Sequence, residues 1–596
     1  MSSVPERSDV AEEYTWDLTD LFADDEEWEA TYAEVEERLE DLSAYEGRVV
    51  EDAETLQAVL ELRESIMRDV ANVAAYARMR RDEDTTDQRY QALTARAQSL
   101  SADASSAASF VEPELQSVDR DRIDELVDAD PDLAEYDHYF DDVLRMKDHT
   151  RSAEVEALLA DLGEVTGAAG EVYNMLTNAD IEFPSVDVDG EPRRITLSNF
   201  TTLQKHPDRD VRRRVYEAFY DEWAEYRNTV GTAYENSVTA DRKLARARDY
   251  ETAREAAMDG PNVPVEVYDT LVDTVEANLD VLHRHAELKR DRLGVDELRM
   301  WDLYAPLSGE EGPDLDYDRA KEHVVEAVAP LGETYRDRTA EGLESRWVDV
   351  YETADKQSGA YSGGTYDSQP YILLNYQDDV ASMYTLAHEL GHSMHSELTS
   401  DAQPHVYSGY EIFVAEVAST VNEALLTHHL LETIDDESFR RAVLDEYLER
   451  FRSTLFRQTM FASFEHRAHE LSADGEALTP DRLDELYRGM KADYYEPAVV
   501  DDRIAREWMR IPHFYRAYYV YQYATGISAA VAVVDRILEE GDPAATDYRE
   551  FLRSGSRAYP LELLETAGVD MSTPEPVEAA IGTYDEMVGE YESLGE

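Results

Sequence analysis

The chain has 596 residues, and its 132 acidic residues outnumber the 56 basic ones to give a formal net charge of -76 at pH 7. This charge excludes nucleic acid and anionic membranes as partners, because phosphate groups bind to basic patches and none is visible. No cysteine is present, which excludes disulfides, thiolate nucleophiles and cysteine zinc sites. With 43% hydrophobic residues, the chain has enough apolar surface to form large cores, so we expect a globular protein.

The first residues, MSSVPERSDVAEEYTWDL, are polar and acidic and contain no apolar segment of the kind found in a secretory signal. No apolar run approaches the ~20 residues of a transmembrane helix. We therefore expect a cytoplasmic protein. The excess of carboxylates further indicates a salty cytoplasm, because the Debye length falls to about 3 Å at ~1 M salt and the self-repulsion is then screened.

Apolar residues recur at three- and four-residue spacing from residue 26 to about residue 170, as in WEATYAEVEERLEDL, which predicts helical hairpins. Two stretches differ: residues 187–197 carry an Asp-Gly turn, and residues 358–376 change from loop to strand, so both are candidates for β-hairpins. The fold class is therefore mostly α. We expect an N-terminal helical lobe over residues 1–200 and a catalytic domain over residues 201–596, packed together because no linker separates them.

Three of the 15 histidines crowd into TLAHELGHSMHSELTS. His388 and His392 form an HExxH pattern, in which two imidazoles one helical turn apart can reach the same Zn²⁺. Glu389 lies at the edge of that face and is placed to act as general base without binding the metal. On an ideal helix the histidines occupy one side, facing an open space, and the opposite side carries a core stripe of Met383, Leu386, Leu390 and Met394. The alternative is an amphipathic helix with surface histidines.

A catalytic zinc needs a third protein ligand and an open position for water. Glu416 is the best candidate, because an ionised carboxylate within FVAEVA is costly unless it is paired or binds a metal. Glu423, seven residues further on, is a candidate partner for a ligand histidine. His395 is the rival third ligand, but it lacks the glycine turn and longer spacing that a third histidine normally has. We expect one Zn²⁺ per chain.

A third cluster is the aromatic stretch IPHFYRAYYVYQYATG near the C-terminus. Tyrosine and histidine are side chains that donate hydrogen bonds to the oxyanion of a tetrahedral intermediate. On an ideal helix Tyr518 and Tyr521 lie about 60° apart and can both point into one cleft. The alternative is that these aromatic residues form core and packing contacts.

Together these motifs closely resemble oligoendopeptidase F, of the zinc metallopeptidase family that includes thimet oligopeptidase. The likeness covers nearly the whole chain and is carried by HELGHSMHS, IFVAEVASTVNEALL, HFYRAYYVYQYATG, EEYTWDLTDLFADDEEWEA, NVPVEVYDTL and QPYILLNY. It implies a largely helical, elongated body with a deep central channel, zinc at the floor of the channel, and cleavage restricted to short unstructured peptides.

The resemblance also implies roles for individual residues. His388, His392 and Glu416 match the zinc ligands of the family, and Glu389 matches its catalytic glutamate. The function that follows is a zinc-dependent endopeptidase that hydrolyses internal bonds of short oligopeptides. Two alternatives stay open from the sequence: a non-catalytic zinc-containing scaffold that binds peptides, and an exopeptidase built on the same motif.

The resemblance places His513 and the tyrosines that follow it in the region that stabilises the transition state. The interval after His513 is shorter than in the thimet branch, which favours Tyr518 and Tyr521 over Tyr515. The resemblance also implies that the glycines around Tyr361, in SGAYSGG, form a mobile loop near the substrate. An ordinary hairpin turn is the alternative there.

The charge imbalance generates a prediction about salt. Because molar KCl screens repulsion among the carboxylates, the midpoint of thermal unfolding should rise steadily between low and molar KCl. Differential scanning calorimetry over a KCl series measures this shift, and a midpoint that does not change with KCl would refute the salt adaptation.

Overall fold

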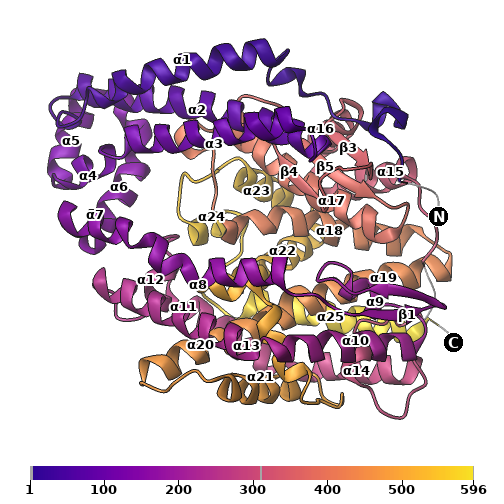
Figure 1. The fold of residues 1–596 in the computed structure, drawn as a ribbon. Helices are drawn as coiled ribbons and strands as arrows, with labels where there is room; N and C mark the ends of the chain where they lie inside the picture. The colour runs from indigo at the N-terminus through magenta and orange to yellow at the C-terminus, as the bar shows by residue number, and fades with distance from the viewer. Residues whose placement is uncertain (1–3, 309–311, 595–596) are drawn as a thin grey trace. The chain divides into compact units, whose positions relative to one another are not determined.

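The computed structural model describes residues 4–308 and 312–594, and most of these residues lie in helices (Figure 1). The prediction of a mostly α fold with a few short hairpins is confirmed. Among the described residues, no helix combines the length and the apolar character that crossing a bilayer requires.

The chain folds into two compact units, and each unit is assembled from three stretches of sequence. The first comprises Met1–Asp148, Asp314–His429 and Val533–Gly568, and the second comprises His149–Pro313, Leu430–Ala532 and Val569–Glu596. The chain therefore passes between the units several times. The domain boundary that we expect at residue 200 stays a prediction.

The helices of the first unit include a long N-terminal bundle, in which α1, α2 and α3 lie side by side (Figure 1). Aspartates begin these helices: the carboxylates of Asp24, Asp52 and Asp87 each accept a hydrogen bond from a first-turn N–H group, which such a helix end otherwise leaves unpaired. The helices are α1 (Asp25–Ser43), α2 (Ala53–Glu83), α3 (Gln88–Ala108), α4 (Val111–Gln116), α5 (Arg120–Ala129), α6 (Asp137–Arg145), α15 (Tyr317–Ala327), α16 (Glu333–Glu344), α17 (Val380–Ala402), α18 (Ile412–Thr433, ending in the second unit), α23 (Asp542–Leu552) and α24 (Pro560–Thr566).

A three-stranded sheet in the first unit has the order β3-β5-β4, from β3 (Val348–Tyr351), β4 (Tyr361–Gly363) and β5 (Tyr371–Tyr376). β5 pairs parallel with β3 and antiparallel with β4, so the predicted hairpin is present and β3 is a strand that the sequence reading missed. The central strand, YILLNY, is almost wholly buried because Tyr371 and Leu373 join the core of the N-terminal bundle while α17 also packs against the strand.

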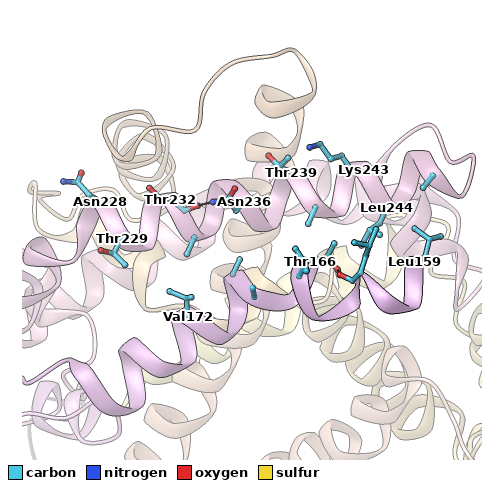
Figure 2. Close-up of a pocket in the computed structure, with 17 residues that line it drawn as sticks. Leu159, Thr166, Val172, Asn228, Thr229, Thr232, Asn236, Thr239, Lys243 and Leu244 are labelled. Atoms are coloured by element: carbon cyan, nitrogen blue, oxygen red, sulfur yellow. Dashed lines mark hydrogen bonds between the residues drawn. The ribbon is translucent and has the colours of Figure 1, made fainter. Parts of the chain in front are cut away.

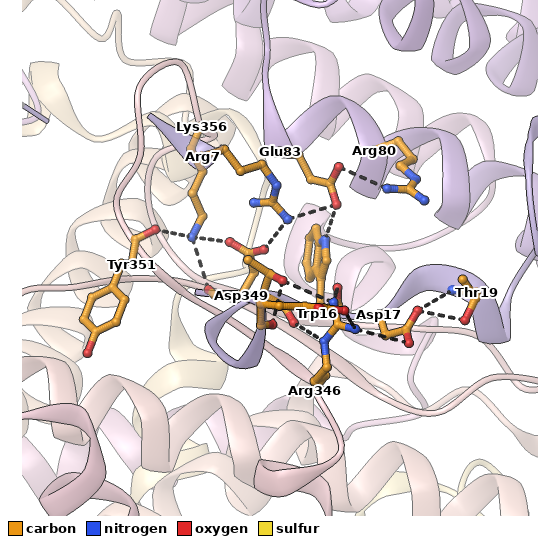
Figure 3. Close-up of polar contacts among 12 residues, drawn as sticks. Arg7, Trp16, Asp17, Thr19, Arg80, Glu83, Arg346, Asp349, Tyr351 and Lys356 are labelled. Carbon is orange, nitrogen blue, oxygen red and sulfur yellow. Dashed lines mark hydrogen bonds and ion pairs between the residues drawn. The ribbon is translucent and has the colours of Figure 1, made fainter. Parts of the chain in front are cut away.

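The N-terminal segment joins the bundle to this sheet through ion pairs, in which Asp349 and Lys356 are buried and Arg7 and Glu83 half-buried (Figure 3). The Arg7 guanidinium bridges Glu83 at the end of α2 (3.0 Å) and Asp349 of β3 (2.6 Å). Asp349 also pairs with the buried Lys356 ammonium at 2.7 Å, and the Trp16 indole N–H donates to Glu83. Each buried charge is thus paired, which is the condition under which burial of a charge is tolerated.

The second unit is also helical and carries the other hairpin, β1 (Ser185–Val188) and β2 (Glu191–Arg194). Its turn residues Asp189 and Gly190 both have positive φ, as a tight two-residue turn requires, so this predicted hairpin is confirmed. The helices are α7 (Ala153–Asp161), α8 (Gly163–Met175), α9 (Phe200–Gln204), α10 (Arg209–Glu225), α11 (Arg227–Ala247), α12 (Ala253–Asp259), α13 (Val265–Ala277), α14 (Leu279–Arg292), α19 (Glu437–Phe451), α20 (Arg457–Ala473), α21 (Pro480–Tyr494), α22 (Tyr521–Glu540, ending in the first unit) and α25 (Glu575–Ser593).

Candidate active site

The contact between α17 and α18 depends on the glycine of the HELGH sequence. A Cβ atom on Gly391 would lie 2.5 Å from the carbonyl oxygen of Ala418 and 2.5 Å from the Cα of Ser419, closer than real atoms approach. Only glycine therefore lets the two helix backbones come this near. The close approach brings Glu416, two residues before Ala418, to the histidines of α17.

Three side chains converge at this contact. The Nε2 atoms of His388 and His392 are 3.3 Å apart, and the Glu416 Oε2 atom lies 3.7 and 3.9 Å from them. Two ligand atoms that bind one tetrahedral zinc ion with bonds of 2.0 to 2.1 Å are separated by about 3.4 Å. The three donor atoms are therefore spaced to fit one zinc ion without a movement of α17 or α18. The three residues are half-buried, and among the described residues they form the one group of metal-binding type within 4.8 Å.

Glu423 holds the first of these imidazoles. The Nδ1–H of His388 donates to the Glu423 carboxylate at 2.6 Å, which leaves the Nε2 lone pair turned toward His392 and Glu416. Burial disfavours a charged His388, but the hydrogen bond and the negative charge of Glu423 outweigh burial and raise the pKa of His388 to about 9. Burial and the positive charge of His388 lower the pKa of His392 to about 3. A divalent cation would replace the proton on His388, so metal binding here releases a proton.

Glu389 lies near the three metal-binding candidates, because its carboxyl group interacts electrostatically with His388 and Glu416. The residue is only 7% exposed, and its carboxylate accepts a hydrogen bond from the backbone N–H of Ser362 in β4. Burial raises the pKa of this carboxyl group above its ordinary value. A second contact joins the same strand to α17, since the hydroxyls of Ser362 and Ser393 are 2.9 Å apart. β4 therefore positions the carboxylate that the motif assigns as general base.

His395 does not face an open space, and this expectation was wrong. The residue is 1% exposed, and its ring stacks on Tyr410 with 3.8 Å between ring centres. It lies outside the group formed by His388, His392 and Glu416. The helical periodicity placed it on the histidine face correctly, but Tyr410, on the segment that precedes α18, covers it. The opposite stripe of Met383, Leu386, Leu390 and Met394 is fully buried, as expected.

Tyr361 lies in β4, in the hairpin that the sequence offered as the alternative to a mobile loop. Its hydroxyl donates to the Asp82 carboxylate at the end of α2 (2.8 Å), and the Arg78 guanidinium lies over its ring. Gly364, which follows the strand, has φ +127°, a conformation that favours glycine. The structure thus anchors Tyr361 to the bundle, and a contact with substrate stays a prediction.

The aromatic stretch after residue 511 belongs to the second unit, and its structure differs from the helix that we expected. A short 3-10 helix, η12 (Pro512–Tyr515), is followed by an irregular turn, and α22 begins only at Tyr521. Tyr518 lies in that turn with φ +56°, so the helical angle between Tyr518 and Tyr521 does not apply. Both residues are buried; the Tyr518 hydroxyl is 3.2 Å from Nδ1 of His466, and the Tyr521 ring packs against Tyr268.

His513 instead has two other tyrosines beside it. Its ring centre is 5.8 Å from that of Tyr519 and 5.9 Å from that of Tyr523, and the two tyrosine hydroxyls are 3.5 Å apart. All three residues are half-buried. Tyr515 stacks on Tyr173 of α8 instead. The sequence reading preferred Tyr518 and Tyr521 to Tyr519 and Tyr523, and helical spacing could not have found this pair because Tyr519 lies before the start of α22.

The family of this chain is shown by its similarity to known proteins. Residues 202–583 match peptidase family M3, and residues 114–183 match a family described as oligopeptidase F. The chain is 43% identical to oligopeptidase PepF of Bacillus subtilis (strain 168), over 100% of this chain and 89% of that protein. It is 40% identical to group B oligopeptidase PepB of Streptococcus agalactiae, over 99% of this chain and 98% of that protein. The crystal structure of oligoendopeptidase-F from Enterococcus faecium superposes with a TM-score of 0.74 at 35% identity, covering 96% of this chain and 99% of that one.

The chain belongs to peptidase family M3 and is a peptidase. Within that family its similarity is to the oligoendopeptidase F group, so the resemblance stated from the motifs is confirmed.

The hydrogen bond from His388 to Glu423 predicts a loss of metal affinity when its charge is removed. We expect Glu423→Gln to weaken zinc binding by about 10- to 100-fold, because the carboxylate orients the imidazole and raises its basicity. Competition with a chromogenic chelator measures the dissociation constant. Glu397→Gln is the matched control, since Glu397 lies on α17 but pairs with Arg338 and not with a ligand histidine. Equal zinc affinity in the two variants would contradict this role of Glu423.

Proposed function

We propose that the protein is a zinc-dependent endopeptidase that cleaves internal bonds of short oligopeptides. The observation that carries this proposal is the meeting of the Nε2 atoms of His388 and His392 with a Glu416 oxygen beside the buried Glu389. Three protein ligands suit a catalytic zinc, which keeps a fourth position for water, whereas a structural zinc normally has four protein ligands. Membership in family M3 supports the same conclusion.

His388, His392 and Glu416 would hold the ion, one per chain. When bound, zinc supplies a Lewis acid that acidifies a water and polarises the peptide carbonyl. Glu389 takes the proton from the attacking water onto its carboxylate and later gives it to the nitrogen of the leaving amine. Burial suits Glu389 to this task, because the raised pKa of its carboxyl group makes it easier for the carboxylate to hold the proton between the two steps. The N–H of Ser362 keeps the carboxylate oriented in both steps.

The donors to the oxyanion come, in this proposal, from the segment that begins at His513. The sequence points to Tyr518 and Tyr521, and the ring contacts add Tyr519 and Tyr523 as the tyrosines beside His513. A donor must reach solvent or substrate, which favours the half-buried pair over Tyr518, whose hydroxyl lies beside His466. A salty cytoplasm stays our prediction for the location of this activity, on the strength of the charge.

Replacement of the general base tests the function directly. We expect Glu389→Gln to bind one zinc per chain and to lose about 10²- to 10⁴-fold in kcat, because the amide cannot accept the proton. Zinc analysis and mass spectrometry of digested peptides measure both quantities. Full activity in this variant would end the proposal. If the wild-type protein binds zinc but cleaves no oligopeptide, it is a scaffold, and cleavage only of peptides with free termini would make it an exopeptidase.

The choice of oxyanion donor is tested by single phenylalanine substitutions. Loss of one donor typically costs about 10²- to 10³-fold in rate, so Tyr523→Phe should lower kcat by that amount with little change in KM. Tyr518→Phe serves as the matched comparison and should stay within about tenfold of the wild type, since its hydroxyl lies beside His466. A larger loss of kcat in Tyr518→Phe than in Tyr523→Phe would contradict this choice and would indicate Tyr518 as the oxyanion donor.

A further inference from the structure

Two consecutive tyrosines lie in different surroundings at the turn between η12 and α22. Tyr518 is 3% exposed and packs against α20, whereas Tyr519 is half-buried beside His513. The chain changes direction at Tyr518, whose φ of +56° is uncommon for a residue with a side chain and persists only where neighbouring contacts hold it. The direction of the Tyr519 ring therefore depends on the group that fixes the backbone of Tyr518.

Glu465 of α20 is that group. Its Oε1 atom accepts a hydrogen bond from the backbone N–H of Tyr518, with 2.9 Å between oxygen and nitrogen. The residue is 1% exposed, so water does not compete for this bond. The other oxygen, Oε2, is buried and has no hydrogen-bond partner among the described residues. Burial raises the pKa of the Glu465 carboxyl group to about 8, so at neutral pH it is mostly an uncharged acid that accepts one N–H.

The same helix holds the turn at both of its ends. Before the turn, the Phe514 ring is 1% exposed and lies against the rings of Phe461 and Phe464 of α20, with ring centres 5.6 and 5.2 Å apart. Within the turn, the Tyr518 hydroxyl is 3.2 Å from Nδ1 of His466, also on α20. α20 therefore fixes the stretch that joins η12 to α22, and the backbone contact of the buried acid lies in the middle of this set.

α11 covers Glu465 from another side. Figure 2 shows the face of α11 that lines a groove beside α7 and α8, with Thr232 among its residues. Tyr234 and Asp241 are not among the lining residues and lie seven positions apart, on one face of the helix. Tyr234 is 1% exposed and interacts electrostatically with Glu465, and Asp241 pairs with His469 of α20 at 3.4 Å. Glu465 is thus enclosed between α11, α20 and the turn, away from the groove.

We propose that Glu465 is a positioning residue for the segment that begins at His513: its Oε1 atom holds the backbone at Tyr518 and thereby directs Tyr519 toward His513. The inference rests on the proposed function, in which the oxyanion donors come from this segment. Glu465 acts through the turn and contacts no substrate. The turn requires an acceptor oxygen at one place and does not require a negative charge there. A displacement of the donors by about 1 Å is enough to lower the rate by up to about 10²-fold.

Two substitutions separate the position of the acceptor from its charge. Glu465→Gln keeps an oxygen at the place of Oε1 without a charge, so kcat and KM should stay within about threefold of the wild type. Glu465→Asp keeps the acid but shortens the side chain by one carbon, which withdraws the oxygen from the Tyr518 N–H by about 1.5 Å. For this variant kcat should fall about 10- to 100-fold with little change in KM. Initial rates with a fluorogenic oligopeptide measure both constants.

A binding measurement separates this role from a general loss of structure. A phosphinic peptide carries oxygens on a tetrahedral phosphorus at the place of the oxyanion, so its affinity depends on the donors. Glu465→Asp should weaken its binding by about 10- to 100-fold. In the Glu389→Gln background, where the peptide is not consumed, Glu465→Asp should change the Kd of the corresponding substrate by less than about threefold. Isothermal titration calorimetry measures both affinities.

Thr459→Val is the matched control for a change within α20. Thr459 is fully buried, and its hydroxyl donates to the Leu455 carbonyl of the same helix and makes no printed contact with the turn. This variant should keep kcat and the affinity for the phosphinic peptide within about threefold of the wild type. If Glu465→Asp does not fold, Glu465→Met takes its place with the same expected loss, because methionine has similar length but no acceptor oxygen.

Several results would overturn the proposal. Wild-type kcat in Glu465→Asp would show that the turn does not need this bond. A loss in Glu465→Gln as large as that in Glu465→Asp would show that the charge or the packing matters instead of the acceptor. Equal weakening of substrate and phosphinic peptide, or an equal loss in Thr459→Val, would indicate a general structural role. If the wild type cleaves no peptide, the proposed function itself fails.

Discussion

The close approach of α17 and α18 is the constraint on which the site depends. The four-residue spacing of His388 and His392 places two imidazoles on the same face of one helix. A third ligand from another helix requires the two helix backbones to lie almost in contact. Gly391 permits this, because any side chain there would overlap Ala418 and Ser419. The position of Glu416 beside His388 and His392, and with it the shape of the candidate metal site, follows from the absence of one Cβ atom.

The rest of the first unit holds that helix pair in place. Ion pairs of Arg7 join the N-terminal segment to α2 and β3, and the hydroxyl of Tyr361 joins α2 to β4. β4 in turn contacts α17 through Ser362, whose N–H reaches the Glu389 carboxylate and whose hydroxyl reaches Ser393. The bundle is thus connected to the Glu389 carboxylate through a short series of polar contacts.

Much of the candidate metal site could be predicted from sequence, because it depends on spacing within short segments. The HExxH spacing identifies His388 and His392, and the apolar neighbours of Glu416 make a carboxylate there costly without a positive partner. The seven-residue interval from Glu416 to Glu423 likewise predicted that Glu423 lies near a candidate ligand histidine, and in the structure it contacts His388. The two hairpins and the helical class were equally readable, from an Asp-Gly turn and from apolar spacing.

The features that sequence did not reveal depend on contacts between distant segments or on broken periodicity. Tyr518 was chosen from the angle between residues on an ideal helix. The chain is not helical between η12 and α22, so that angle does not give the directions of the tyrosine side chains. His395 was expected to face a space that Tyr410 fills. Periodicity within one helix cannot report such pairings.

The account is tested most directly by anomalous diffraction at the zinc absorption edge, on crystals of the protein grown with one equivalent of zinc. It predicts one peak within about 2.0 to 2.2 Å of Nε2 of His388, Nε2 of His392 and a carboxylate oxygen of Glu416, with no fourth protein ligand. A folded protein with no peak at that position, or with the ion held by four protein side chains, would contradict it.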